Sequence, residues 1–411
     1  MRRDGVAKGA PAARTRALFL AIGAGVLARL LVIAVAMIRR GPEAFIVPDS
    51  ATYLWLANSL AAGRGFVDAW GKPELFRTPA YPLLLAAGAA SPVTWALLAN
   101  LVLLAGIILL TFVLARHVTG DETLAGVCAI AVAIEPTLMS WSLRVMPETL
   151  LTLCLVVFAC AALRAIDSRR PLWILAAAAS ICAAAYAKPI AYPLVFLLCA
   201  ISLLRPRAAL IFVLACAAFL LPWHLRNEAR TGHFVFSTLF ARAAYLGVGG
   251  SIVAQREHRP YDTVRMEMLD HIDVHGRAAD PSQYAREGLS ILASDPLGYA
   301  KTHVRGMLRT MFDPGASEYL RFAGLYGEGG RARLASRGVG GVARAYPLMF
   351  WSSVALALLL APLVLLPLLG LIRAREPASL LLALIAAYVI TAGGGVPGQA
   401  RFACPRYRFS W

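Results

Sequence analysis

The chain alternates long apolar runs with short polar connections. Nine runs reach or approach the roughly 20 residues that a helix needs to cross hydrocarbon, at 17–38, 93–115, 122–140, 148–166, 171–187, 190–204, 207–223, 347–371 and 378–392. A further apolar piece at 79–90 is too short to cross alone. Because lipid offers no partners to backbone polar groups, such runs must be helical. The pattern predicts an all-α polytopic membrane protein with nine or ten spans.

Composition supports this prediction and excludes some classes of protein. Hydrophobic residues make up 59% of the chain and charged residues 15%, whereas soluble domains carry about 25% charged residues. The net charge of +17 fits basic residues that flank membrane helices and meet anionic headgroups. No basic module interleaved with aromatic residues is present, so nucleic acid is not an expected partner. The seven cysteines form neither a CxxC pair nor a His–Cys cluster, so neither disulfides nor zinc are predicted.

The basic residues also predict an orientation. They gather before the first span and in three short connections, at Arg2, Arg3, Lys8, Arg14, Arg16, Arg164, Arg169, Arg170, Arg205, Arg207, Arg373 and Arg375. With nine spans these positions share one side, which the positive-inside rule makes cytoplasmic. The opposite side then receives the loop 39–92, the connection near Arg144, the turn at Lys188 and the polar region 224–346. We expect three segments: a membrane module at 1–223, a small extracytoplasmic helical layer at 224–346 with helical pattern across 281–312, and a membrane segment at 347–411.

The outer loop 39–92 carries the first candidate acid. Asp49 and Ser50 can cap a helix that runs to about Ala62, with Gly63 as its stop. One face of that helix is predicted to lie in the membrane interface; it is formed by Tyr53, Leu56, Ala57 and Leu60. Two interpretations of Asp49 stay open: a helix cap without further role, or a reactive carboxylate at the membrane surface.

Further candidates lie on the same predicted side. Arg77, followed by Thr78-Pro79-Ala80-Tyr81-Pro82, suits a phosphate group through forked hydrogen bonds, or serves as a headgroup anchor. Glu148 begins the fourth span, where an acid can also serve only to stabilise the positive end of the helix dipole. Glu135, near the end of the third span, is a third candidate acid or a residue at a frayed helix end. Two carboxylates at one membrane face could act as a general base and as a clamp for a divalent cation or a hydroxyl group.

Three cations complete the set. Arg29 lies midway along the first span, where a charge costs about 2.5–3.5 kcal/mol or more. We expect it to face the bundle interior, to pair with an acid or with carbonyls, and to be structural. Lys188 and Arg226 lie on the predicted outer side, either as phosphate contacts or as anchors at the interface.

These pieces, in this order, resemble a known family. Pro-Asp-Ser-x-x-Tyr at Asp49 is followed by Arg-Thr-Pro-x-Tyr-Pro at Arg77, by Pro-Glu-Thr-Leu at Glu148 and by Pro-Trp-x-x-Arg-Asn at Arg226. The set is similar to the GT-C glycosyltransferases, in the branch of the protein O-mannosyltransferases, the lipid A aminoarabinose transferases and the RgtA/B/C/D-like bacterial enzymes. The resemblance covers roughly residues 17–227 and implies a GT-C-like bundle of transmembrane helices.

The resemblance also implies a reaction and its partners. The family transfers a sugar from a polyprenyl-phosphate carrier to a hydroxyl acceptor, which is a glycolipid, polysaccharide or protein, outside the bacterial inner (plasma) membrane. It implies Asp49 as general base and Glu148 as supporting acid, with a divalent cation at these two carboxylates left open. Substrate and phosphate contacts would come from Arg77, Tyr53, Tyr81, Lys188 and Arg226.

The sequence also allows an alternative function, and it departs from the family pattern at one motif. A transporter or flippase of lipid-linked saccharide is the alternative, although it would more often show paired half-chain repeats. The family's Arg-aromatic-Arg-x-Pro motif is altered here to Arg401-Phe402-Ala403-Cys404-Pro405, and no apolar run follows. The end therefore reads like a truncation or a shifted reading frame.

Overall fold

The computed structural model describes residues 11–203, 206–273, 280–313, 315–324, 338–348, 350–358, 369–370 and 376–394. Across these ranges the protein is helical, and the only extended pairing is an isolated bridge between Val67 and Pro73. Four helices are long and apolar enough to cross a membrane: α1 (Pro11–Arg40), α4 (Pro92–Thr119), α7 (Glu148–Ser168) and α10 (Pro206–Thr231). The predicted all-α, membrane-embedded class is confirmed.

The third predicted span is a broken helix. It consists of α5 (Glu122–Ile134) and α6 (Pro136–Ser142), which are bent by 52° relative to each other and would make a fifth span if taken together. Pro136 lacks the amide hydrogen that a continuous helix needs, so the helix ends before it. Glu135 accepts hydrogen bonds from the amides of Thr137 and Leu138 and so starts α6. The expectation that Glu135 lies at a helix end is confirmed.

Other predicted spans differ in length. The helices α8 (Pro171–Ala187) and α20 (Pro377–Gly394), and α9 (Tyr192–Ser202) after the short turn η2 (Pro189–Ala191), are apolar but shorter than the four long helices. Helix α10 continues to Thr231, eight residues past the predicted end at 223, with Pro222 inside it. About half of the predicted span 347–371, namely residues 349, 359–368 and 371, lies outside the described residues.

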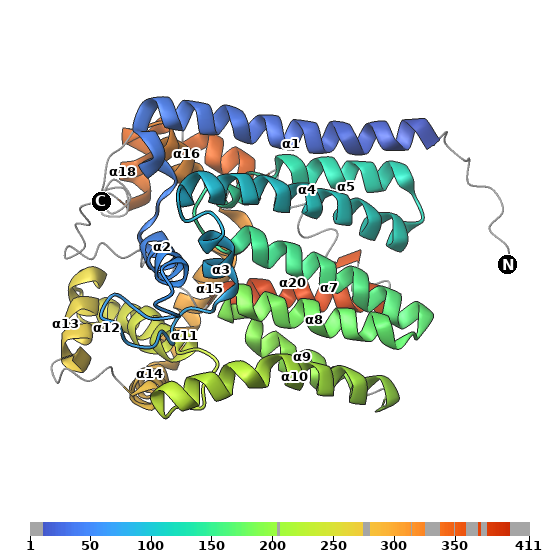
Figure 1. Cartoon of the computed structure of the whole chain (residues 1–411). Coiled ribbons are helices and arrows are strands. Elements are labelled where there is room, and N and C mark those ends of the chain that lie inside the picture. Colours follow the sequence, from blue (N-terminus) through green and yellow to red (C-terminus); the bar gives the residue numbers. More distant parts are fainter. Residues whose placement is uncertain are drawn as a thin grey trace.

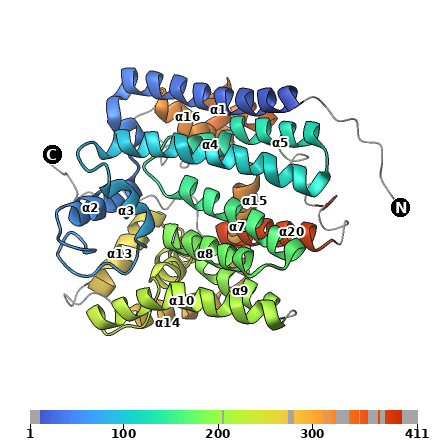
Figure 2. The ribbon, with the colours of Figure 1, turned by 45° about the vertical axis from the view of Figure 1, so that its right-hand side comes forward.

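The long helices lie side by side, and most of the connecting elements gather at one end of them, on the left in Figure 1 and again in Figure 2. This end carries η1 (Gly41–Phe45), α2 (Pro48–Ala61) and α3 (Ala80–Ala86) from the loop 39–92. It also carries α11 (Leu239–Arg242), the π-helical turn η3 (Ala243–Gly249), α12 (Gly250–Arg256), α13 (Tyr261–Asp273), α14 (Pro281–Ser294) and α16 (Ala316–Phe322). Segments far apart in the sequence therefore meet at a single end of the bundle, which we call the polar end.

Two further helices complete the described part of the chain between this end and α20. Helix α15 (Pro296–Phe312) packs along α20, and α18 (Gly338–Ala345) follows α16 in the chain. The helical pattern predicted across 281–312 is confirmed as two helices, α14 and α15, separated at Asp295, whose side chain caps α15.

The largest apolar core lies between α7, α8, α9 and α10. Small side chains dominate the α8 face, with Ala177, Ala178, Ala184 and Ala185 all 3% exposed or less. Small residues allow helix backbones to approach closely, which drives packing in lipid, where the hydrophobic effect is weak.

Candidate functional site

Helix α2 holds Asp49 at the polar end. The hydroxyl of Ser50 accepts a hydrogen bond from the Val47 amide, 3.0 Å away, and Pro48 occupies the first helical turn. Asp49 lies in that turn but makes no capping bond. The predicted role of Ser50 is confirmed and that of Asp49 as a cap is wrong, because the Asp49 carboxylate is directed to another partner. Gly63, with φ +71°, follows the helix end as predicted.

The partner of Asp49 is Arg77. The Asp49 Oδ1 atom lies 3.1 Å from Arg77 Nη2, with the carboxylate side chain 28% exposed and the guanidinium side chain 7% exposed. Arg77 also donates to the Tyr53 hydroxyl at 3.3 Å and lies over the Tyr53 ring. Burial alone lowers the pKa of Arg77, but Tyr53 and Asp49 more than offset this, so its pKa is raised and the cation is retained.

The Tyr53 face of α2 packs into protein. Tyr53 meets Tyr81 of α3 edge to face, with ring centroids 5.3 Å apart, and both rings are almost fully buried. Val145 and Met146, from the turn before α7, complete this cluster. The prediction that this face lies in a membrane interface is wrong for Tyr53, Leu56 and Ala57, which are at most 1% exposed.

A second carboxylate–cation pair lies beside the two tyrosines. The Glu148 Oε1 atom, in the first turn of α7, lies 2.8 Å from Lys188 Nζ, at the end of α8. Burial raises the pKa of Tyr81, and the charge of Glu148 acts in the same direction. Burial also raises the pKa of Tyr53, with Glu148 and Asp49 both adding to the shift against Arg77. Met146 and Leu150, on either side of Glu148 in the chain, pack in the cluster that contains Tyr53 and Tyr81. The two acids predicted from sequence therefore lie near the same tyrosine pair.

Some of the buried polar atoms without a partner among the described residues belong to this site. They include the Arg77 Nε and Glu148 Oε2 atoms and the hydroxyls of the residues that follow each, Thr78 and Thr149. Thr78 is 1% exposed and Thr149 is fully buried. An unsatisfied buried polar group is costly and calls for an explanation such as a ligand. The set offers donors and acceptors together.

Arg226, predicted as a phosphate contact or as an anchor at the interface, makes its hydrogen bonds within the protein. Its guanidinium donates to the carbonyls of Phe66 and Glu74, at 2.8 and 3.2 Å, and to the Asn227 side chain. It also lies over the rings of Phe66 and Trp223. Arg226 thus fastens the loop that carries Arg77 to the end of α10, and three of its hydrogen bonds go to the protein itself.

Two cations that the sequence did not single out also lie close to Asp49. Arg242 of α11 lies over the ring of Phe76, the residue before Arg77. Arg265 of α13 is 5% exposed, and the charges of Arg242 and Asp49 shift its pKa in opposite directions. Neither arginine belongs to a motif, and the segment 224–346 was expected only to form a layer. Nothing in the sequence pattern could have placed them there.

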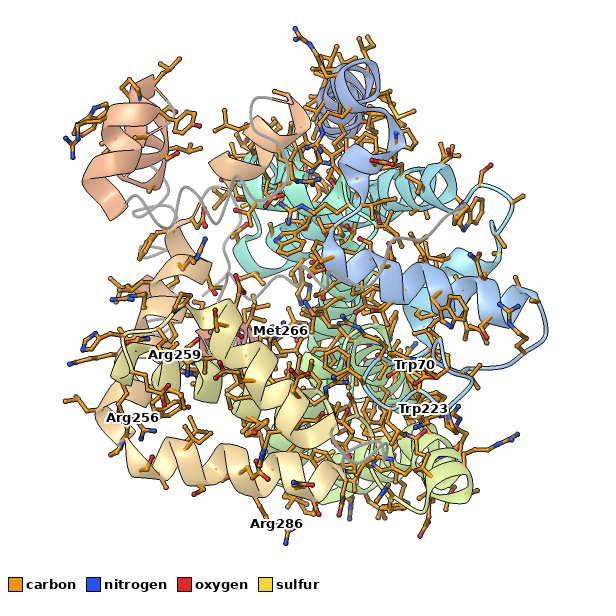
Figure 3. The ribbon with its side chains drawn as sticks, turned by 90° about the vertical axis from the view of Figure 1, so that its left-hand side faces the viewer. Trp70, Trp223, Arg256, Arg259, Met266 and Arg286 are labelled. Carbon is orange, nitrogen blue, oxygen red and sulfur yellow. The ribbon has the colours of Figure 1, made fainter. Side chains whose placement is uncertain are left out.

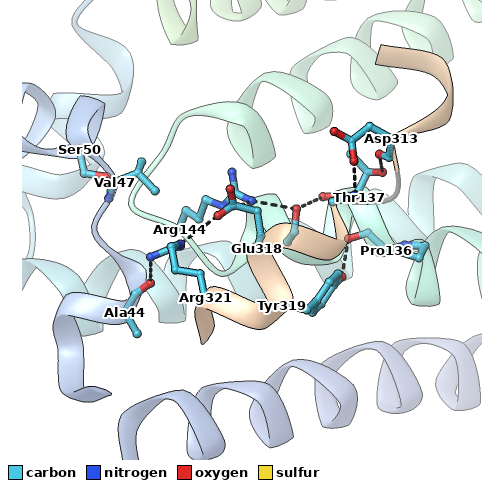
Figure 4. A network of polar contacts seen from close by, with 12 residues as sticks. Ala44, Val47, Ser50, Pro136, Thr137, Arg144, Asp313, Glu318, Tyr319 and Arg321 are labelled. Atoms are coloured by element: carbon cyan, nitrogen blue, oxygen red, sulfur yellow. Dashed lines mark hydrogen bonds and ion pairs between the residues drawn. The ribbon is translucent and has the colours of Figure 1, made fainter. Parts of the chain in front are cut away.

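A separate buried polar network braces the same end (Figure 4). Arg144 pairs with Glu318 of α16 at 3.0 Å, and Glu318 also pairs with Arg321 at 3.0 Å. Arg321 donates to the Ala44 carbonyl, and the Tyr319 hydroxyl donates to that of Pro136. These contacts tie α16 to η1 and to the turn that leads into Glu148.

Arg29 is fully buried, as expected. It donates to the Ser142 hydroxyl at 2.7 Å and to the carbonyls of Ala133 and Gly25 at 2.7 and 3.0 Å. The prediction of a structural arginine that faces the bundle interior and pairs with carbonyls is confirmed.

A cavity of about 320 Å³, open to the surface, lies between helices of the bundle and not at the Asp49–Arg77 pair. Its lining is mostly apolar and comes from α4, α5, α6 and α7. Thr152 and Val156 contribute to it, one and two turns beyond Glu148 along α7.

The carboxylates do not fit a divalent cation. Among the described residues, no group of three or more His, Cys, Asp or Glu side chains is arranged to hold a metal ion. Asp49 and Glu148 are each engaged by a cationic side chain. Calcium and magnesium prefer several oxygen ligands, so we derive no step through a metal.

The fold and the site together define a class: an all-helical protein with membrane-length apolar helices and paired charges at one end. Comparison with known proteins goes no further, because no family model, no curated protein and no solved structure matches the chain.

Proposed function

We propose that the protein is a membrane glycosyltransferase that moves a sugar from a polyprenyl-phosphate carrier to a hydroxyl acceptor at the extracytoplasmic side of a bacterial inner membrane. One observation carries the proposal. Two carboxylate–cation pairs, Asp49–Arg77 and Glu148–Lys188, lie near one tyrosine pair at the polar end of apolar helices.

The reaction uses these groups in defined roles. Asp49 accepts the proton of the acceptor hydroxyl, whose oxygen attacks the anomeric carbon of the sugar. The bond between that carbon and the phosphate oxygen breaks, and the bonding electrons leave with the phosphate. Arg77 and Lys188 stabilise the negative charge that develops there.

The unsatisfied atoms support these roles. The Arg77 Nε atom is a buried donor without a partner among the described residues, and a phosphate oxygen is the acceptor that it fits best. The Glu148 Oε2 atom is a buried acceptor that also lacks a partner among the described residues, and it suits a hydroxyl of the sugar or of the acceptor. The apolar cavity beyond Glu148 along α7 is a place for part of the prenyl chain.

The test is transfer of labelled sugar from a panel of polyprenyl-phosphate sugars, with the full chain in lipid nanodiscs. We expect Asp49→Asn to lower the turnover by about 100-fold or more, as for loss of a general base. Glu257→Gln, which changes an exposed acid at the end of α12, is the matched control and should retain turnover. Turnover by Asp49→Asn equal to that of the wild type would remove Asp49 as base. Movement of the donor across the bilayer without transfer would favour the transporter.

A further inference from the structure

A second group of cations faces Asp49 from the outer layer of the polar end. The Arg242 guanidinium, at the end of α11, lies between two rings, 4.8 Å from the centroid of Phe76 and 5.6 Å from that of Tyr284. Arg77 lies over the same Phe76 ring at 4.4 Å. The two guanidinium groups therefore share one aromatic side chain, beside the Asp49–Arg77 pair.

Arg265 of α13 belongs to the same group. Its side chain is buried, and burial lowers its pKa; the nearby Arg242 acts in the same direction, whereas Tyr261, Asp262 and Asp49 oppose the shift. Arg265 therefore adds positive charge close to Arg242, while the rings of Phe76 and Tyr284 hold the Arg242 guanidinium in its orientation.

The acids nearby do not pair with Arg242. Asp49 pairs with Arg77, and the Glu74 carboxylate accepts from the backbone amides of Phe76 and Arg77. Glu287 of α14 accepts a hydrogen bond from Gln283. Within the described part of the chain, Arg242 makes no ion pair and its contacts are the two rings. A guanidinium stacked between rings is held in orientation while the N–H groups at its edge remain able to bind a planar or tetrahedral oxyanion.

We propose that Arg242, with the positive charge of Arg265 beside it, binds an oxyanion of the acceptor, a phosphate or a carboxylate, so that the enzyme acts on anionic acceptors. This rests on the proposed function. The lipid tail of the donor comes from the side of the apolar helices, where Arg77 and Lys188 can reach its phosphate. Arg242 and Arg265 belong instead to α11 and α13, in the layer farther along the chain that covers the polar end. The Asp49 carboxylate pairs with Arg77 of the first set, and its charge acts on Arg265 of the second, so an acceptor hydroxyl at Asp49 would lie near both.

The experiment measures binding by calorimetry, with the full chain in nanodiscs of phosphatidylcholine. The probes are glucose 6-phosphate, glucose and farnesyl phosphate. We expect glucose 6-phosphate to bind at least about tenfold more tightly than glucose, as for one or two charge-assisted hydrogen bonds. Arg242→Gln and Arg265→Gln should each remove most of that preference and leave the affinity for farnesyl phosphate within about twofold. Arg242→Lys, which keeps the charge without the fork, should show an intermediate preference.

The matched control is Arg286→Gln, since Arg286 of α14 is exposed and points away from the protein in Figure 3; its preference should equal that of the wild type. Equal binding of glucose and glucose 6-phosphate by the wild type overturns the proposal. So does an Arg242→Gln variant, shown by its melting curve to be folded, that keeps the preference. A loss of farnesyl phosphate binding as large as that of glucose 6-phosphate overturns it too, because the anion would then belong to the donor. Binding that depends on Arg242, without any sugar transfer, would leave the anion site standing and overturn the proposed function.

Discussion

The Glu318 carboxylate lies 3.0 Å from the Arg144 guanidinium, and both side chains are at most 3% exposed. The two residues come from α16 and from the turn between α6 and α7. Since that turn runs directly into Glu148, the pair helps to fix the position of one of the candidate acids.

Loss of this pair should be severe. Glu318→Ala leaves the Arg144 and Arg321 cations without their shared carboxylate, and we expect it to lower the free energy of unfolding by about 3–5 kcal/mol. Thermal and denaturant unfolding in detergent micelles measures the change. The double variant Arg144→Met with Glu318→Leu should recover part of the loss, because no buried charge is then stranded at Arg144. Glu257→Gln, at an exposed ion pair, is the control and should leave the unfolding midpoint unchanged. An equal shift of the midpoint in Glu318→Ala and in Glu257→Gln would contradict the prediction.

Arg29 should be needed for the packing of α1. Its guanidinium joins α1 to the end of α5 through the Ala133 carbonyl and to α6 through Ser142. We expect Arg29→Met to reduce stability by about 2 kcal/mol, because buried hydrogen bonds from a charged group are lost. Arg29→Lys should not restore it, since lysine lacks the planar fork. Arg39→Met, at an exposed position of the same helix, is the control. Unfolding in micelles that does not distinguish Arg29→Met from Arg39→Met would refute this.

Arg226 should control the order of the loop before Arg77. Because it donates to the Phe66 and Glu74 carbonyls, Arg226→Ala should raise the rate of amide hydrogen exchange across residues 65–76 by about tenfold or more. Exchange in α4 should not change. Arg230→Ala, one turn further along α10 and exposed, is the matched control. Mass spectrometry of peptides from this loop gives the readout, and unchanged exchange in Arg226→Ala would show that the loop is held by other contacts.

The start of α14 should depend on pH. Asp280 accepts hydrogen bonds from the Ser282 amide and hydroxyl, at 2.9 and 2.6 Å, and these bonds lower its pKa below the ordinary value. A carboxyl whose pKa is lowered on folding stabilises the fold above its unfolded-state pKa, and that contribution is lost as the pH falls through the folded-state pKa. Amide exchange in the first turn of α14 should therefore report a looser helix end at about pH 3 than at about pH 6, after correction for the intrinsic rate. Asp280→Asn, which caps without titrating, should abolish the difference; a persistent difference would exclude Asp280 as its cause.

Glu148 and Lys188 should act as one unit in sugar transfer. If the pair supports the reaction, Glu148→Gln and Lys188→Met should each lower kcat/KM by about tenfold or more, whereas the double variant should lose much less than the product of the two. Additive losses would show that the two side chains act separately. The Glu257→Gln variant serves as the control for expression and folding.

The sequence by itself determined the class of protein and several helix positions. The length of an apolar run fixes whether a helix can cross hydrocarbon, and this is a local property, so α1, α4 and α7 were predictable. The interior position of Arg29 followed from the cost of a charge in lipid, and the cap at Ser50 and the stop at Gly63 followed from turn chemistry next to them in the chain. The break at Pro136 was signalled by the proline itself.

The tertiary structure decided which charges meet. The sequence left Asp49 open as a helix cap or a reactive carboxylate, and the fold brings Arg77, 28 residues later in the sequence, to 3.1 Å from that carboxylate. Arg226 was predicted as a phosphate contact or an interface anchor, and in the fold it donates to carbonyls of a distant loop. Arg242 and Arg265 had no signal at all. Ion pairs and hydrogen bonds act over a few ångströms between residues far apart in the chain, so their partners are set by how helices pack and not by the pattern along the sequence.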